Sequence, residues 1–99
     1  MKEHFLLGID IGTSGCKLVV FGNLGEVKAF DSQSYQTYYS DPGFVEQNAD
    51  DWWTAVARGV ANIFSTTKVR PSDISAIGIA GQSPTCLPVA KDGSPLRKA

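Results

Sequence analysis

Two apolar runs joined by a very short turn constrain the fold of this chain more than any other feature. Residues 5–11 form a nearly continuous apolar run, residues 17–21 form a second, and the small-residue turn Gly12-Thr13-Ser14-Gly15 lies between them. Parallel strands need a crossover connection of a dozen or more residues, so this turn predicts an antiparallel pair. The continuity of the first run predicts a central strand that is buried on both faces.

The following 60 residues predict the rest of a mixed α/β sheet. A third strand is expected from about residue 26 to residue 35, and its alternating pattern favours a place near the sheet edge. A helix is expected after Asn48, a good N-cap residue. A buried strand is expected within residues 73–81, beside the first strand. The apolar stripe of the expected helix comprises Trp53, Val56, Ala57, Val60, Ile63 and Phe64.

The last segment has the pattern of a hairpin arm followed by a turn. Residues 87–90 are extended and apolar, Lys91-Asp92-Gly93 is the turn, and a returning arm would begin near Pro95. We expect that arm to be incomplete at Ala99, so that the chain ends inside a fold and leaves a sheet edge open. An open edge on so small a segment predicts self-association, for example as a homodimer.

Composition argues against several classes of function. A net charge of −1 provides no basic surface for nucleic acid or for an anionic membrane. The apolar runs are too short for a membrane span, and no secretory signal is visible. The two cysteines, Cys16 and Cys86, are too few for a disulfide framework and lack metal-ligand spacing. We therefore expect a cytoplasmic protein with reduced thiols.

The turn after the first strand has the chemistry of an anion-binding site. In Gly12-Thr13-Ser14-Gly15 the glycines let backbone amides approach a phosphate closely, and the two hydroxyls add donors. Lys17 adds a positive charge nearby. Asp10 would repel a phosphate unless a cation lay between them, and Mg²⁺ held by one carboxylate and waters meets that requirement.

This turn is neither a P-loop nor a dinucleotide-binding fingerprint. A P-loop has four residues between its glycines and a Ser or Thr after its lysine, whereas here Leu18 follows Lys17 and two residues separate Gly12 from Gly15. The turn also joins two strands instead of opening a helix.

The segment Gly8-Ile9-Asp10-Ile11-Gly12-Thr13-Ser14 resembles the first phosphate motif of the actin, heat-shock chaperone and sugar kinase superfamily. Three more segments resemble xylulokinase-like FGGY carbohydrate kinases: Gly43-Phe44-Val45-Glu46-Gln47 before Asp51-Trp52-Trp53, the strand 77–82, and the turn at 91–93. The resemblance covers essentially the whole chain. It implies a ribonuclease-H-like α/β fold, with residues 1–99 as the N-terminal part of the first lobe and the second lobe absent.

The resemblance also implies a role for each residue of the phosphate motif. ATP and the sugar would bind in the cleft between the two lobes. Asp10 would help to hold Mg²⁺, mainly through water. Gly12, Thr13 and Ser14 would line the phosphates of ATP, and Lys17 would reach toward the transferred group. The general base and the adenine pocket would lie beyond this segment, so no residue here is assigned as catalytic and the segment alone is expected to be inactive.

The end of the strand 77–82 would lie near the substrate, a sugar or a polyol. The resemblance implies that Gln82, Ser83 and Pro84 form this part of the site. Where xylulokinases read Gly-Gln-Met-His-Gly, this chain reads Gly81-Gln82-Ser83-Pro84-Thr85. The loss of the Met-His pair argues against D-xylulose and leaves another sugar or polyol open.

Two other functions stay open at this point. A nucleotide-switched protein of the actin or chaperone type would share the phosphate turn, and a free-standing module could simply bind an anion. Several side chains also have two interpretations. Trp52 and Trp53 either pack the helix or offer a platform to a sugar, and Glu46 is either a hydrogen-bonding loop residue or a surface charge.

Overall fold

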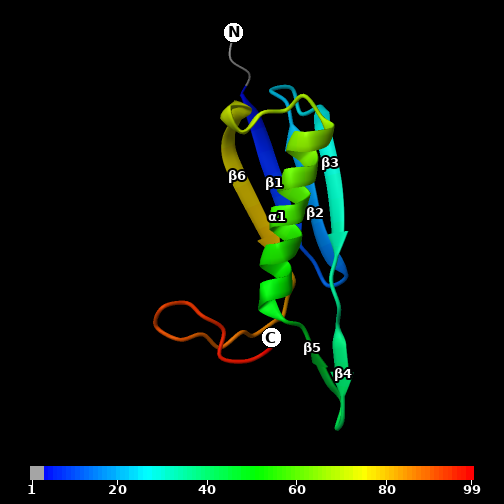
Figure 1. The fold of residues 1–99 in the computed structure, drawn as a ribbon, viewed down its shortest axis with the longest axis vertical. Coiled ribbons are helices and arrows are strands. Elements are labelled where there is room, and N and C mark those ends of the chain that lie inside the picture. The colour runs from blue at the N-terminus through cyan, green and yellow to red at the C-terminus, as the bar shows by residue number, and fades with distance from the viewer. Residues whose placement is uncertain (1–3) are drawn as a thin grey trace.

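A four-stranded mixed sheet with a helix lying across one face forms the body of the molecule (Figure 1). The computed structural model describes residues 4–99. A two-stranded hairpin extends from the sheet at the end where the helix begins. The elements, in chain order, are β1 (Phe5–Ile11), β2 (Gly15–Phe21), β3 (Val27–Ser34), β4 (Tyr38–Ser40), β5 (Phe44–Glu46), α1 (Ala49–Thr66), the 3-10 turn η1 (Pro71–Asp73) and β6 (Ile74–Gly81).

The strand order of the sheet is β3-β2-β1-β6. β1 is antiparallel to β2 and parallel to β6, and β2 is antiparallel to β3. These pairings confirm the antiparallel first pair, the edge position of the third strand and the place of the later strand beside the first. Because β1 and β6 are parallel, Ile11 pairs with Gly81, and the turn after β1 meets the residues that follow β6.

The prediction that β1 is buried on both faces is wrong. Phe5, Leu7 and Ile9 are buried, whereas Leu6 and Asp10, which point to the opposite face, are exposed. α1 covers the first of these faces (Figure 1). Within residues 4–99 no helix or strand covers the second face, so the apolar run is half buried.

The prediction that the strand 73–81 is buried is also wrong. Ile77 and Ile79 are 57% and 71% exposed. They pair with Leu7 and Ile9, so they share the face on which α1 lies. The helix packs against β2 and β3, however, and β6 lies beside it without cover from the described residues (Figure 1).

The helix begins where the sequence predicts. The side chain of Asn48 accepts a hydrogen bond from the backbone nitrogen of Asp50 at 3.1 Å, which caps the first turn. Asp50 and Asp51 place negative charge at the amino end of the helix dipole. No helix among residues 4–99 has both the length and the apolar character that crossing a membrane requires.

The buried row of α1 differs from the predicted stripe. Trp53 is 73% exposed, so its prediction as a core residue is wrong, as is that of Ala57. A Cβ atom at Gly59 would lie 2.4 Å from Cδ1 of Leu18, which shows how closely the helix approaches β2 at that point. This approach draws one row of the helix onto the sheet. The row comprises Ala55, Gly59 and Ile63, with Val56, Val60 and Phe64 half buried beside it.

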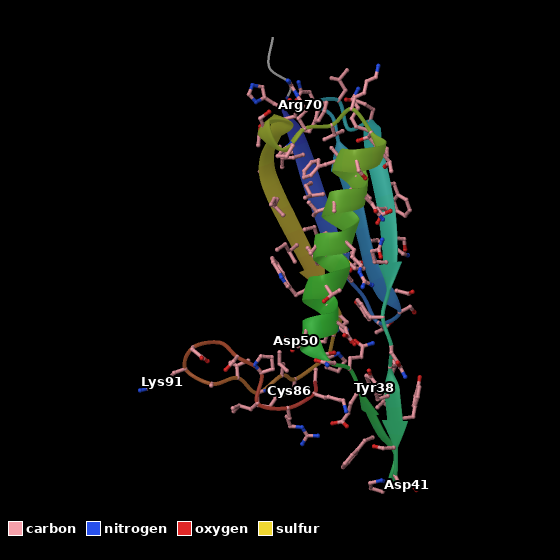
Figure 2. The ribbon with its side chains drawn as sticks, viewed as in Figure 1. Tyr38, Asp41, Asp50, Arg70, Cys86 and Lys91 are labelled. Atoms are coloured by element: carbon pink, nitrogen blue, oxygen red, sulfur yellow. The ribbon has the colours of Figure 1, made fainter. Side chains whose placement is uncertain are left out.

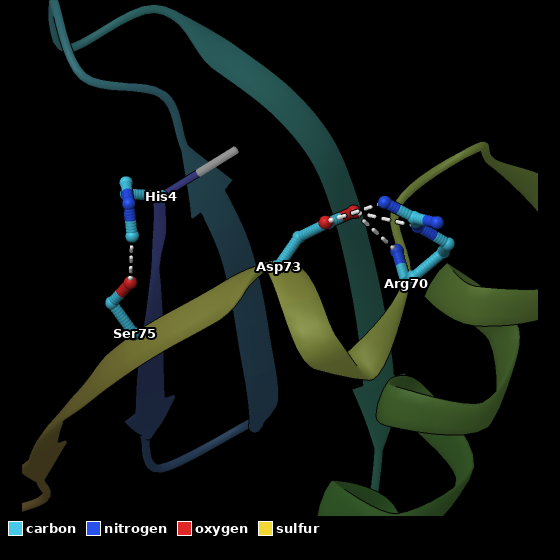
Figure 3. Close-up of polar contacts among 4 residues, drawn as sticks. All are labelled: His4, Arg70, Asp73 and Ser75. Carbon is cyan, nitrogen blue, oxygen red and sulfur yellow. Dashed lines mark hydrogen bonds and ion pairs between the residues drawn. The ribbon is translucent and has the colours of Figure 1, made fainter. Parts of the chain in front are cut away.

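Polar contacts hold the end of the sheet that lies away from the turn between β1 and β2 (Figure 3). Asp73 accepts from the backbone nitrogen of Arg70 at 3.0 Å, and its other oxygen lies 3.2 Å from the guanidinium of Arg70. His4 and Ser75 approach within 3.1 Å and join the start of β1 to β6. These contacts fix the entry of the chain into β6.

Two extended segments complete the fold. The turn predicted at residues 41–43 closes the hairpin of β4 and β5, whose strands the sequence did not predict. The second hairpin has its returning arm where the sequence predicts, because Val89 pairs with Pro95 and the backbone nitrogen of Leu96 donates to the carbonyl oxygen of Pro88 at 3.0 Å. The returning arm then continues and pairs with residue 47.

Candidate functional site

The turn between β1 and β2 is tightly closed. Gly12 donates its backbone nitrogen to the carbonyl oxygen of Gly15 at 3.0 Å. A Cβ atom at Gly15 would lie 2.4 Å from the backbone oxygen of Gln33, so a side chain there would push β3 away. Thr13 and Ser14 form the exposed tip. The sequence thus places glycine where strand packing demands it and hydroxyl donors where solvent or a ligand can reach them.

On one side of the turn lies a hollow of about 340 Å³, called here the smaller hollow. All five residues predicted to bind Mg²⁺ and phosphate line it. Asp10 and Lys17 are cross-strand partners, so a negative and a positive side chain leave the sheet side by side. The lining residues are Asp10, Gly12, Thr13, Ser14, Gly15, Lys17, Ser32, Gln33 and Ser34.

Three polar residues of the smaller hollow were missed by sequence reasoning. Ser32, Gln33 and Ser34 come from the end of β3. The register pairs Lys17 with Ser32 and Gly15 with Ser34, which brings this polar run beside the turn. The run itself was the available signal, because an alternating apolar strand that turns wholly polar at its end has lost its contact with a core.

On the other side of the turn lies a larger hollow of about 770 Å³. Gln82 and Pro84, predicted to lie near the substrate, line it, whereas Ser83 is exposed and is not part of its wall. Thr13 and Ser14 line both hollows, so the turn separates them. The other lining residues are Thr37, Tyr39, Phe44, Val45, Glu46, Gln47, Thr85, Cys86, Pro88, Arg97, Lys98 and Ala99.

The larger hollow lies at the end of the molecule where the helix begins. Figure 2 shows Tyr38 and Cys86 at this end, close to Asp50, while Arg70 lies at the opposite end. Glu46 ends β5 and forms an ion pair with Arg97, so it is neither a loop residue nor a free surface charge. The ammonium group of Lys98 lies 4.7 Å from the ring centre of Tyr38. The wall therefore carries charge of both signs.

Two glutamine side chains connect the turn to the rest of the site. Gln82 donates from Nε2 to the carbonyl oxygen of Gly12 at 3.2 Å and to Oε1 of Gln47 at 2.8 Å. Gln47 donates to the carbonyl oxygen of Thr13 at 2.8 Å. The indole nitrogen of Trp52 donates to Gln47 at 3.0 Å, so this tryptophan supports the network.

Burial controls the ionisation of two groups behind the turn. The hydroxyl of Tyr35 donates to the carbonyl oxygen of Gly12. Burial, followed by the nearby Cys16 and Asp10, raises the pKa of Tyr35 to about 12, so the donor proton is retained at neutral pH. Burial also raises the pKa of the Cys16 thiol, so this fully buried cysteine stays protonated and packs as a small apolar residue.

The carboxylate of Asp10 suits a water-rich magnesium site. Within residues 4–99 no three His, Cys, Asp or Glu side chains gather as a metal cluster. Mg²⁺ keeps several of its waters and often takes only one or two carboxylates together with substrate phosphates. The exposed carboxylate of Asp10, beside a turn rich in amide and hydroxyl donors, fits a magnesium ion that keeps most of its waters.

These features define an α/β fold in which a tight turn, rich in hydrogen-bond donors, joins two antiparallel strands and borders two hollows. Residues 5–99 match the model of the N-terminal domain of the FGGY family of carbohydrate kinases. The chain therefore belongs to the FGGY family of carbohydrate kinases, as the resemblance in its motifs indicated.

The individual relatives that the chain matches are named as kinases of glycerol or xylulose. The chain is 33% identical over 98 residues to a glycerol kinase from Geobacillus kaustophilus and 32% identical over 99 residues to a xylulose kinase from Staphylococcus epidermidis. These alignments include 98% and 100% of this chain but 20% of each relative. The chain thus spans about a fifth of the length of the curated relatives it matches.

Solved structures confirm the ribonuclease-H-like α/β fold of the actin and sugar kinase superfamily. A xyloylose kinase from Brucella ovis has a TM-score of 0.90 at 24% identity, and a xylulose kinase from Rhodospirillum rubrum has 0.82 at 25% identity. Each comparison covers 96% of this chain and 20% of the solved chain.

Proposed function

We propose that this chain is the N-terminal segment of an ATP-dependent kinase that transfers the γ-phosphate of ATP to a hydroxyl of a sugar or polyol. The observation that carries the proposal is the position of Thr13 and Ser14, which line both hollows. Phosphoryl transfer requires a donor and an acceptor roughly in line on opposite sides of one phosphoryl group. The amides and hydroxyls of this turn border both hollows, which suits a phosphoryl group that lies between ATP in one hollow and its acceptor in the other.

On the nucleotide side, Lys17 and the hydrogen-bond donors of the smaller hollow would offset negative charge on the phosphates of ATP. The turn Gly12-Thr13-Ser14 would line the phosphates with amides and hydroxyls, and Lys17 would reach toward the transferred group. Asp10 would hold Mg²⁺, largely through water. Mg²⁺, when bound, supplies charge neutralisation at the phosphate oxygens.

On the acceptor side, the mixed lining of the larger hollow favours a polar substrate. Gln82, Ser83 and Pro84 would lie near a sugar or polyol, with Ser83 outside the wall as it stands. The names of the relatives make glycerol and xylulose the first substrates to test. The general base and the adenine pocket would come from residues beyond this segment, so residues 1–99 alone are expected to be inactive. We place the kinase in the cytoplasm.

The experiment is ATP consumption by the intact protein with Mg²⁺ against glycerol, pentuloses, hexuloses, aldonates and other polyols. We expect turnover on at least one of them. Asp10→Ala should lower kcat by about 10²- to 10³-fold, since it removes the carboxylate that would hold Mg²⁺ beside the phosphates. The matched control is Asp41→Ala, which removes an exposed carboxylate from the β4–β5 turn and should leave kcat unchanged.

A different outcome would favour the other nucleotide-binding class. Slow ATP hydrolysis that no sugar or polyol accelerates would contradict the kinase and support a nucleotide-switched protein of the actin or chaperone type. Equal activity of Asp10→Ala and Asp41→Ala would contradict the assignment of Asp10.

A further inference from the structure

One buried glutamine side chain joins the two halves of the site. Gln47 lies between β5 and α1 and is 7% exposed. Its Nε2 group donates to the carbonyl oxygen of Thr13 at 2.8 Å and to the hydroxyl of Thr37 at 2.9 Å. Its Oε1 atom accepts from Trp52 at 3.0 Å and from Gln82 at 2.8 Å. The amide therefore uses both of its donor hydrogens and both of its acceptor positions.

The partners of this amide fix its orientation. The indole N–H of Trp52 can only donate, and the carbonyl oxygen of Thr13 can only accept. The oxygen of the Gln47 amide must therefore face Trp52, and its nitrogen must face the turn. The backbone of Gln47 is held as well, because its nitrogen and oxygen pair with Ala99 at 3.1 and 2.8 Å. Neither the side chain nor the main chain of this residue can shift without breaking several bonds.

The hydrogen bonds of Gln47 end on the two segments that would hold the two substrates. Thr13 belongs to the turn proposed to line the phosphates of ATP, and Gln82 follows β6 at the proposed acceptor side. Gln82 also donates its backbone nitrogen to Ile11 at 2.8 Å and its side chain to Gly12 at 3.2 Å. The turn and the end of β6 are thus joined directly and, through Gln47, a second time.

We infer that Gln47 is a positioning residue that sets the spacing between the phosphate turn and the acceptor side of the site. The inference rests on the proposed kinase function and adds a role that the motif residues do not supply. All polar atoms of the Gln47 amide already bond to other protein groups, so this side chain would affect substrates only through Thr13 and Gln82. Displacement of reacting groups by about 1 Å can cost on the order of 10²-fold in rate. Loss of the bridge should therefore lower kcat and leave the two KM values nearly unchanged.

The test compares Gln47→Glu, Gln47→Met and a matched control, Gln36→Glu, in the intact kinase. A carboxylate at position 47 still accepts from Trp52 and Gln82 but turns an oxygen toward the carbonyl oxygen of Thr13. At pH 8 we expect kcat of Gln47→Glu to fall roughly 10- to 100-fold, with KM for ATP and for the acceptor within about threefold of wild type. Gln36 is exposed, and its variant should retain the wild-type kcat.

The pH profile separates positioning from a general loss of structure. Protonation of the new carboxyl group restores an O–H donor toward Thr13, so the kcat of Gln47→Glu relative to wild type should recover as the pH falls from 8 to 6. Gln47→Met, of similar length but without polar atoms, should show no recovery. Other ionisable groups of the site, among them Tyr35, Glu46, Arg97 and Lys98, are common to both proteins. The ratio to wild type at each pH therefore isolates the effect of the group at position 47.

Each outcome decides the inference. A folded Gln47→Glu with a wild-type kcat at pH 8, or a loss confined to one KM, would overturn it. If wild type phosphorylates no sugar or polyol, the proposed function fails, and amide hydrogen exchange in Gln47→Met decides instead. Loss of protection at both Gly12 and Gln82 would support the bridge, and unchanged protection at both would overturn it.

Discussion

At the scale of single residues, the carbonyl oxygen of Gly12 shows how the turn is held from behind. It accepts hydrogen bonds from the hydroxyl of Tyr35 and from the side chain of Gln82. Both donors lie far along the chain from residue 12. The carbonyl oxygen of Gly12 is therefore held by the protein, while Thr13 and Ser14 at the tip of the turn stay exposed to a ligand.

Replacement of Tyr35 by Phe should reduce stability modestly. One hydrogen bond to Gly12 is lost while that from Gln82 remains, so we expect the free energy of unfolding to fall by about 0.5–1.5 kcal/mol at pH 8. Urea denaturation measures the change. Tyr39→Phe is the control, because Tyr39 is exposed.

The pH dependence of this difference has a defined sign. Burial, with Cys16 and Asp10, raises the pKa of Tyr35 from 10.0 to about 12 in the folded state, so folding favours the protonated hydroxyl. The contribution of Tyr35 is therefore fully present below about pH 10 and is lost as the pH rises through about 12. The difference between wild type and Tyr35→Phe should shrink over this range, and a difference that grew would contradict the assignment.

The sequence predicted the residues of the turn and its two strands better than the residues that hold the turn in place. Asp10, Lys17 and the residues of the turn are close in the chain, and two short strands were enough to bring them together. The roles of Tyr35 and Gln47 depend on contacts across 23 and 34 residues. Polar residues in a loop are usually exposed, so nothing local indicated that these two would point inward.

At the scale of elements, Gly59 determines which row of α1 meets the sheet. Periodicity predicted the helix and its cap, because both depend on neighbouring residues. It did not predict the rotation of the helix, since a stripe that counts only apolar side chains passes over a glycine. The close approach to Leu18 instead places Ala55, Gly59 and Ile63 against the sheet and leaves Trp53 in solvent.

A branched side chain at Gly59 should separate the helix from β2. Leu18 is fully buried and a Cβ atom at Gly59 would lie 2.4 Å from it, so Gly59→Val should lower the free energy of unfolding by about 1–3 kcal/mol through overpacking. Ala61→Val, at an exposed position of the same helix, should cost only about 0.5 kcal/mol in helix propensity. Equal decreases in the melting temperature of the two variants would show that the contact between Gly59 and Leu18 does not determine the stability of the helix packing.

At the scale of the whole molecule, the sheet is wider than the helix that covers it. The sequence predicted β6 as buried because its residues are apolar, but burial depends on what packs against a strand. α1 packs against β2 and β3, so Ile77 and Ile79 stay exposed on a strand that is also the edge of the sheet. Apolar pattern alone indicates which residues need cover, and it does not indicate which element provides it.

This uncovered strand predicts that the 99-residue chain associates with itself. An edge strand offers unpaired backbone groups, and neighbouring exposed isoleucines add apolar area that water disfavours. Sedimentation velocity of residues 1–99 should therefore show a mass that rises with concentration. Ile79→Lys should weaken this association, because a charge on an edge strand opposes pairing with a second copy.

Leu24→Lys makes the same change in an exposed turn far from β6 and should leave association unchanged. A chain that stays monomeric at about 100 µM, or equal effects of the two lysines, would show that this edge does not drive association.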